Sequence, residues 1–331
     1  MSEDMTRDSS GRAWLVRPQD ERRIIVCGPD ARAYVHRMVS NDVEALAVGA
    51  GCHALYLKPQ GHITADLVIL RTGEDALEVL VPEAAFATVL KRWTMFLLND
   101  DAEVLAGAVE GAEDSSAALN DEPRVLLTLQ GAGAAGVLAA AELPTPAEPY
   151  GHEVASFLDV ELRILRRARL AASTPGFDLI VPAEGASAVA SALEANGAER
   201  VEPERLELER IRGLMPRFGP DLNDTVLPQE AWLERDAISF EKGCYPGQET
   251  VAKIKYRGRV NRRLVGLELD QDAAPETELQ REGKRVGRLT SVATDDTGER
   301  IGLGYLKREL CEVGQSFDLD GGGTATVRAV P

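Results

Sequence analysis

Two segments one hundred residues apart share one arrangement, and this repeat constrains the fold more than any other sequence feature. Residues 77–83 read L-E-V-L-V-P-E, and residues 177–183 read F-D-L-I-V-P-A. In both, an apolar run that fits a strand ends at a proline, which suits the start of a helix. A helical pattern follows, over Glu83–Phe96 in the first case and up to Asn196-Gly197 in the second. The repeat predicts two related halves of the α+β class.

The last part of the chain has a different pattern. Short apolar runs separated by turn residues occupy Arg263–Leu269, Lys284–Ala293, Arg300–Lys307 and Thr324–Val330. This spacing predicts a small all-β barrel or sandwich at the C-terminus. A polar, acidic stretch at 107–122 predicts a loop or a domain boundary.

Charge and cysteine content exclude several classes of protein. The net charge of −17 over 331 residues argues against general nucleic-acid binding and against DNA as a partner. The four cysteines form no C-x-x-C pair, and the four histidines have no metal-ligand spacing, so we expect no metal site. The N-terminus is polar and no apolar run reaches about 18 residues, so we expect a cytoplasmic protein without a membrane span.

The segment K-G-C-Y-P-G-Q-E at residues 242–249, here called the signature turn, concentrates unusual chemistry. Its two glycines and one proline predict a shaped turn. The Cys244 thiol lies two residues after the Lys242 ammonium, and a nearby cation favours the reactive thiolate. Gln248 and Glu249 add an amide and a carboxylate that could hold a polar ligand. A purely structural turn is the alternative interpretation.

A basic run follows the signature turn. Residues 253–263 read K-I-K-Y-R-G-R-V-N-R-R and contain no acid. As a strand, the run would place Lys253, Lys255, Arg257 and Arg259 on one face, where a polyglutamate tail, phosphates or RNA could bind. The alternative is a solvated edge strand whose charges deter aggregation.

Together, these segments resemble the YgfZ family of folate-binding proteins, which is related to aminomethyltransferase, the T-protein of the glycine cleavage system. The signature turn carries the most specific part of the resemblance. The other matching segments are R-M-V-S-N-D-V at 37–43, P-Q-G-H-I-T-A-D-L at 59–67, L-L-T-L-Q-G at 126–131, G-R-L-T-S-V at 287–292 and I-G-L-G-Y-L at 301–306.

The resemblance implies a three-domain ring of two α+β domains and a small C-terminal β-barrel. We place the first domain at 12–50 and 122–256, where it includes the signature turn, the second at 51–121 and the barrel at 257–331. It also implies tetrahydrofolate or a folate derivative as the cofactor. The implied role is in assembly or repair of iron–sulfur proteins, with a link to tRNA modification. The implied partners are therefore folate and iron–sulfur client or assembly proteins.

Site residues follow from the same resemblance. Cys244 would be the reactive thiol, and Lys242 would bias its ionisation. Arg257 would hold an anionic tail. The other candidate folate contacts are Asn41, Glu230, Tyr245, Gly247, Gln248 and Glu249.

Two positions depart from the related T-proteins. Those proteins have an Asp-Asp pair whose first member is catalytic, and the pair here is Ala65-Asp66. They also often carry a glutamate that holds the pterin, at the position of Arg212. Whether the chain is an enzyme therefore stays open. One alternative is a folate-dependent one-carbon transferase or demethylase with Asp66 or Glu230 as its base, and another is an RNA- or protein-binding module that uses residues 253–263.

Overall fold

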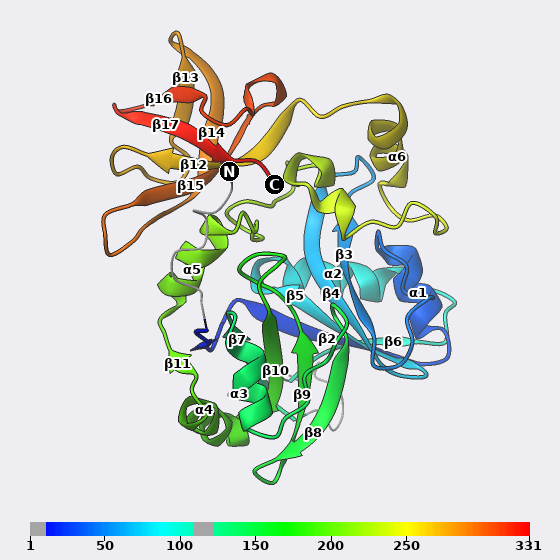
Figure 1. Ribbon diagram of the computed structural model, residues 1–331. Coiled ribbons are helices and arrows are strands. Elements are labelled where there is room, and N and C mark those ends of the chain that lie inside the picture. Colours follow the sequence, from blue (N-terminus) through cyan, green and yellow to red (C-terminus); the bar gives the residue numbers. More distant parts are fainter. Residues whose placement is uncertain (1–10, 109–121) are drawn as a thin grey trace. The chain divides into compact units, whose positions relative to one another are not determined.

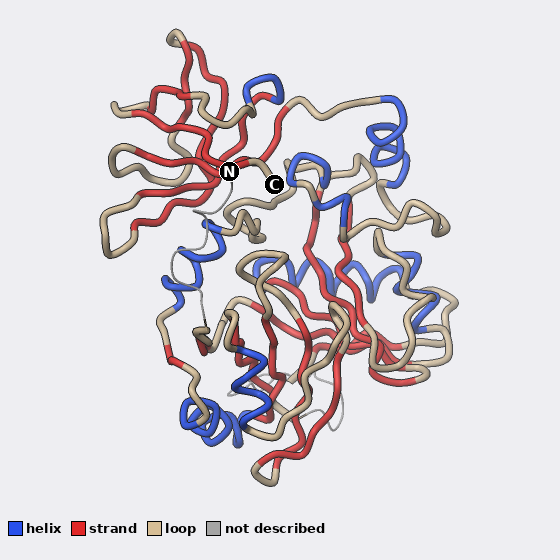
Figure 2. The backbone as a smooth tube through the Cα atoms, in the orientation of Figure 1, coloured by secondary structure: helices blue, strands red, loops and turns tan. Residues whose placement is uncertain are grey.

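The computed structural model describes residues 11–108 and 122–331, so most of the loop predicted at 107–122 lies outside the described residues. The strands form two open sheets and a closed barrel (Figures 1 and 2). The chain divides into two compact units. The first contains Met1–Met38, Asp42–His53 and Leu67–Pro203, and the second contains Val39–Asn41, Ala54–Asp66 and Glu204–Pro331.

A six-stranded sheet lies in the first unit. Its order is β11 (Glu199–Arg200), β1 (Trp14–Val16), β7 (Arg124–Gln130), β10 (Gly176–Pro182), β9 (Val160–Arg166) and β8 (His152–Phe157). The pair β1–β11 is parallel, and the other neighbours are antiparallel. Helices α3 (Ala134–Ala140) and α4 (Ala186–Ala195) share a buried apolar core with this sheet, because both turn alanine, valine and leucine side chains toward it.

The five-stranded sheet has the order β3 (Gly51–Leu57), β4 (Ile63–Gly73), β5 (Ala76–Pro82), β2 (Glu21–Cys27) and β6 (Glu103–Ala106). Helices α1 (Ala31–Met38) and α2 (Glu83–Phe96) belong to the same part of the sequence. Within the first unit, Val68, Leu70 and Leu80 of this sheet pack against Leu165 and Ile180 of the six-stranded sheet. The two sheets of that unit therefore share a small core.

The barrel lies in the second unit. It closes in the order β12 (Arg262–Leu269), β15 (Arg300–Lys307), β14 (Lys284–Thr294), β13 (Glu278–Arg281), β16 (Ser316–Leu319) and β17 (Thr324–Ala329). Helices α5 (Pro203–Arg212) and α6 (Gln248–Arg257) precede the barrel in the sequence. Four short 3-10 helices lie elsewhere along the described chain: η1 (Ala183–Gly185), η2 (Pro228–Ala231), η3 (Leu233–Arg235) and η4 (Arg308–Leu310). In this unit, one buried apolar core contains side chains from the ends of β3 and β4, from α5, from the signature turn and from one side of the barrel.

The predicted α+β class, with two sheets and a C-terminal barrel, is confirmed. The strand–proline–helix repeat is present as β5–α2 and as β10–η1–α4. Pro82 and Pro182 each end the strand and form the cap of the helical segment that follows, with φ of −55° and −50°. The fixed φ of proline suits both roles, which explains why the repeat was readable in the sequence.

The predicted strand within residues 253–263 is wrong. Residues Gln248–Arg257 form helix α6, and β12 begins at Arg262. Alternation of basic and apolar side chains fits a strand, but Gln248, Glu249, Ala252 and the lysines are also good helix formers, and Gly247 in a left-handed conformation starts the helix.

The sheets also divide the chain at places other than the proposed domain boundaries. Strand β2, which we assigned to the first domain, pairs with β5 and β6 of the five-stranded sheet. Residues from Glu204 onward, including the signature turn, belong to the same compact unit as the barrel.

Candidate functional site

The signature turn has a backbone shape that depends on glycine at its end. Gly247 has φ of +83° and directly precedes α6. A Cβ atom placed there would lie 2.6 Å from the Lys58 carbonyl oxygen and 3.0 Å from Cα of Gly61. Gly61 also has a positive φ, in the turn between β3 and β4. The signature turn therefore packs backbone to backbone against the β3–β4 turn, which only glycine permits.

Lys242 begins the signature turn with a buried ammonium group. The residue is 8% exposed, and its Nζ donates a 2.7 Å hydrogen bond to the Val39 carbonyl oxygen. The same Nζ lies 5.3 Å from the centre of the Tyr245 ring. A buried charge is costly unless polar partners stabilise it, so these contacts fix the Lys242 side chain in place. From the sequence we expected this ammonium to influence the ionisation of Cys244, and we did not foresee its hydrogen bond to the Val39 carbonyl.

Residues 39–41 form a second anchor for the segment that leads into the signature turn. The Ser40 hydroxyl donates to the Ala237 carbonyl at 2.6 Å and accepts from the Leu55 amide at 2.8 Å. The Asn41 side-chain amide donates to the Asp236 carbonyl at 2.9 Å. Asn41, predicted as a folate contact, thus has a structural bond in this unit. Ala237 and Asp236 lie 197 and 195 residues further along the chain, so no local pattern signals this anchor.

The four remaining residues of the signature turn that we singled out differ in accessibility. Cys244 is exposed, which leaves its thiol open to solvent. Tyr245 is buried, and burial raises its pKa to about 12, so its phenol stays protonated at neutral pH. Gln248 donates to the Gly243 carbonyl at 3.5 Å, and Glu249 forms an exposed ion pair of 2.6 Å with Lys253. The hydrogen bond from Lys253 lowers the pKa of Glu249.

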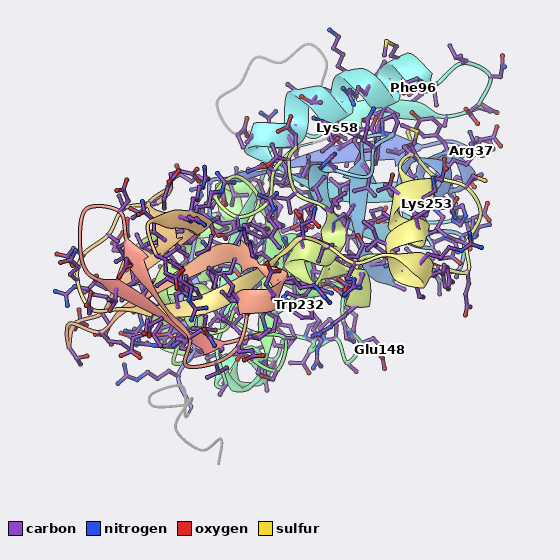
Figure 3. The ribbon with its side chains drawn as sticks, turned by 90° about the horizontal axis from the view of Figure 1, so that it is seen from above. Arg37, Lys58, Phe96, Glu148, Trp232 and Lys253 are labelled. Carbon is purple, nitrogen blue, oxygen red and sulfur yellow. The ribbon has the colours of Figure 1, made fainter. Side chains whose placement is uncertain are left out.

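The basic residues after the signature turn have separate partners. In helix α6, Lys253 and Arg257 lie four residues apart on one side. Lys253, labelled in Figure 3, has an exposed side chain. Lys255 Nζ lies 3.4 Å from the centre of the Phe240 ring. At the start of β12, Arg262 and Arg263 donate to the carbonyls of Thr225 and Gln229. The single basic face that a strand would give is therefore absent.

Glu230, a candidate folate contact or base, is buried with both structural and ionic partners. It is 6% exposed, and its Oε2 accepts from the Leu227 amide at 3.1 Å. The same oxygen lies 3.0 Å from Arg262. Both contacts hold the Glu230 side chain in place within this unit.

The two positions at which this chain departs from T-proteins, Ala65 and Arg212, have different environments. Ala65 on β4 is completely buried, as are its neighbours on the same face, Ile63 and Leu67. Asp66 lies on the opposite face of the strand, with Thr64. Arg212 contacts three carboxylates, those of Glu209 at 2.9 Å and of Asp295 and Glu299 at 2.7 Å each. Arg212 is therefore a fixed cation of this unit, and no hydrogen-bond acceptor stands at its position.

Among residues 11–108 and 122–331, no group of three or more histidine, cysteine or acidic side chains could hold a metal ion. In the same part of the chain, no helix is long and apolar enough to cross a membrane.

Two family models match this architecture. The GCVT N-terminal domain matches residues 13–242, and the glycine cleavage T-protein C-terminal barrel domain matches residues 262–331. Since the first match alone covers more than half of the chain, the chain belongs to the glycine cleavage T-protein family. The sequence expectation of a T-protein-like scaffold is confirmed at this level.

Matches to three individual proteins are consistent with this family. A chloroplastic protein of Arabidopsis thaliana named as a transferase is 26% identical over 312 residues, which are 93% of this chain and 68% of that one. An aminomethyltransferase of Synechocystis is 26% identical over 311 residues, 90% of this chain and 78% of that one. The crystal structure of aminomethyltransferase T of the Bartonella henselae glycine cleavage system has the same fold, with a TM-score of 0.81 and 22% identity over 98% of this chain and 87% of that one.

Proposed function

We propose that this protein binds tetrahydrofolate or a folate derivative but does not carry out the aminomethyl transfer of glycine cleavage. It would act, as the YgfZ resemblance suggests, in assembly or repair of iron–sulfur proteins, with a link to tRNA modification. The observation that carries the proposal is the buried methyl group of Ala65, at the position where the resemblance puts the catalytic carboxylate. The family membership supports a folate ligand, and the relatives named aminomethyltransferases share the scaffold.

The residues present fit part of a folate. Its glutamate tail is anionic, and Arg257 in the last turn of α6 offers a cation with an exposed side chain. The pterin ring needs hydrogen-bond acceptors as well as donors. Arg212 offers no acceptor, so the amide oxygen of Gln248 and the carboxylate of Glu249 are the proposed acceptors. Bound tetrahydrofolate would supply a carrier of one-carbon units, and this chain would supply its binding and orientation.

Cys244 is the proposed reactive group because its thiol is exposed in a turn whose backbone is fixed. The turn is held at one end by the buried Lys242 ammonium and at the other by the packing of Gly247. A site on such a scaffold keeps its position while remaining open to a partner. Lys242 in this proposal positions the turn.

The one-carbon transferase alternative would need Asp66 or Glu230 as its base. Two donors already bind the Oε2 atom of Glu230, which disfavours that residue. The RNA-binding alternative loses its main support because helix α6 replaces the predicted basic strand.

Complementation tests the role of Cys244. In a strain that lacks this protein, we expect Cys244→Ala to restore less than a tenth of the iron–sulfur enzyme activity that the unaltered chain restores. Cys311→Ala is the matched control. Cys311 is half-buried, its thiol donates to the Lys307 carbonyl at 3.4 Å, and burial raises its pKa to about 11, so we expect full complementation. Equal complementation by both variants would overturn the assignment of Cys244.

A further inference from the structure

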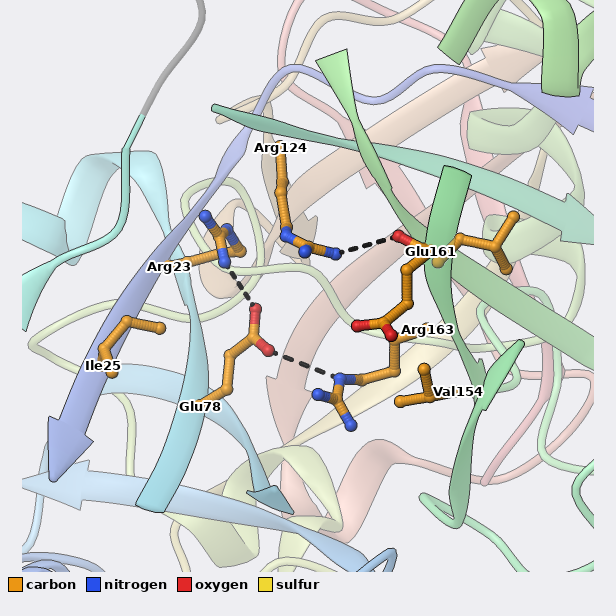
Figure 4. A pocket seen from close by; sticks show the side chains of 8 residues that line it. Arg23, Ile25, Glu78, Arg124, Val154, Glu161 and Arg163 are labelled. Atoms are coloured by element: carbon orange, nitrogen blue, oxygen red, sulfur yellow. Dashed lines mark hydrogen bonds and ion pairs between the residues drawn. The ribbon is translucent and has the colours of Figure 1, made fainter. Parts of the chain in front are cut away.

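A cavity of about 170 Å³ lies within the first unit, between its two sheets (Figure 4). Arg23 on β2 and Glu78 on β5 line it from the five-stranded sheet. Arg124 on β7, with Glu161 and Arg163 on β9, line it from the six-stranded sheet. Neighbouring strands on both sides thus turn charged side chains toward one partly open space, which Ile25, Val154 and Leu162 also line.

The ion pairs in this cavity are unevenly shared. Glu78 lies 3.0 Å from the Arg23 guanidinium and 3.6 Å from that of Arg163, so one carboxylate serves two cations. Its side chain is 7% exposed, and those of Arg23 and Arg163 are 10% and 18% exposed. Arg124 donates to the main-chain oxygen of Glu161 at 3.4 Å, as Figure 4 shows. The lining thus holds three guanidiniums and two carboxylates, and Arg124 also lies 3.7 Å from the carboxylate of Glu122, which is not part of the lining.

Arg163 is a half-buried cation whose surroundings disfavour its charge. Burial lowers its pKa, and the neighbouring Arg124 and Arg23 lower it further, while Glu78 and Glu161 act in the opposite direction. Its guanidinium also donates to Nδ1 of His152 at 2.9 Å. Burial and the charge of Arg163 lower the pKa of His152 to about 4, so this imidazole is neutral at physiological pH and adds no negative charge. A buried cation in this state would be stabilised by an additional anion.

We propose that this cavity binds a small oxyanion the size of phosphate, held by the guanidiniums of Arg23, Arg124 and Arg163. Guanidinium groups present parallel N–H donors that match the oxygen spacing of phosphate and carboxylate groups. At about 170 Å³ the cavity is smaller than the roughly 300–1,000 Å³ of pockets that enclose drug-sized ligands, which excludes a folate. The site is thus separate from the folate site proposed above and does not depend on it.

A purely structural ion network between the sheets is the competing explanation, and it predicts no ligand. The two explanations differ in a calorimetric titration of the full chain with sodium phosphate, compared with sodium chloride at equal ionic strength. We expect one saturable site for phosphate and none for chloride. We expect Arg124→Gln to raise the dissociation constant at least tenfold, and Arg124→Lys to raise it severalfold because a lysine keeps the charge but loses the paired donors.

Arg166→Gln is the matched control, since Arg166 lies on β9 but its guanidinium bonds the main-chain oxygen of Ala147 at 2.8 Å and does not line the cavity. Its phosphate affinity should equal that of the unaltered chain. Unfolding transitions of all variants would establish that each is folded. No saturable phosphate binding by the unaltered chain, or equal binding by Arg124→Gln and Arg166→Gln, would overturn the proposal. Tetrahydrofolate binding by Arg124→Gln should be unchanged, so this proposal can fail or succeed independently of the proposed function.

Discussion

At the scale of single residues, the two glycines of the signature turn differ in backbone conformation and in the space available for a side chain. Gly247 combines a φ of +83° with backbone atoms at 2.6 and 3.0 Å from a hypothetical Cβ, whereas a Cβ at Gly243 would meet nothing within 4 Å. We expect Gly247→Ala to lower the free energy of unfolding by about 3 kcal/mol, from backbone strain and displacement of the β3–β4 turn. Gly243→Ala should change it by less than about 0.5 kcal/mol. Urea denaturation measures both, and equal losses would refute this account of the turn.

The shape of this turn could be predicted from its sequence, but the partner of Lys242 could not. Two glycines and a proline within eight residues indicate a turn by local rules alone. The carbonyl that binds the Lys242 ammonium belongs to Val39, 203 residues earlier in the chain. Such a contact depends on how distant segments meet, and no local pattern encodes it. The same reason explains why the ion pair of Glu230 with Arg262 was not anticipated, whereas the bond of Glu230 to the Leu227 amide is a local contact at the start of η2.

At the scale of secondary-structure elements, a partly buried cluster ties β2 to the other sheet of the first unit. Glu21 on β2 contacts Arg167 and Arg169, which follow β9, at 2.9 Å each. The two arginines also contact Asp178 on β10, which is completely buried. The cluster supplies two acids and two bases, so its charges balance.

This cluster predicts a loss of stability in acid. Burial raises the pKa of Glu21, but Arg167 and Arg169 outweigh burial and bring it from 4.5 down to about 2. Since the folded-state pKa is lowered, the stabilisation is complete above pH 4.5 and is lost as the pH falls toward 2. The lowered pKa corresponds to about 3 kcal/mol. We expect urea denaturation from pH 6 to pH 2 to show this loss.

A matched pair of variants identifies the source of the acid sensitivity. Glu21→Gln should be less stable than the unaltered chain at pH 6 and should show a smaller loss between pH 4.5 and pH 2. Glu249→Gln removes an exposed carboxylate whose ion pair with Lys253 is screened by solvent, so its acid profile should differ from that of the unaltered chain much less than the profile of Glu21→Gln does. An unchanged slope in Glu21→Gln would show that other carboxylates govern acid unfolding.

Elements with strong local signals were predictable, and weak or ambiguous ones were not. Helix α2 has the predicted bounds Glu83–Phe96, because a proline precedes it and its apolar residues keep a helical spacing. Strands β1, β6, β11, β13 and β16 have at most four residues each and were missed, since such short runs depend on their neighbours in the sheet. Helix α6 was misassigned because its alternation fits a strand equally well.

At the scale of the whole molecule, the family membership extends across the chain while the site residues diverge. The two matched domains cover residues 13–242 and 262–331, so the scaffold is that of the T-protein family throughout. Within it, Ala65 and Arg212 stand where the resemblance places a catalytic carboxylate and a pterin acceptor. A shared fold with changed site chemistry is the pattern expected when a scaffold takes up a new role. Folate binding without aminomethyl transfer is therefore the central claim.

Calorimetric titration of the full chain with tetrahydrofolate tests that claim most directly. We predict saturable binding at one site per chain, with a micromolar dissociation constant, and no accompanying turnover of a methylamine donor. We expect Gln248→Ala to weaken binding about tenfold through the loss of a proposed pterin contact. Lys91→Ala, a change on helix α2, is the control and should leave binding unchanged. Absence of binding, or binding accompanied by aminomethyl transfer, would contradict the account.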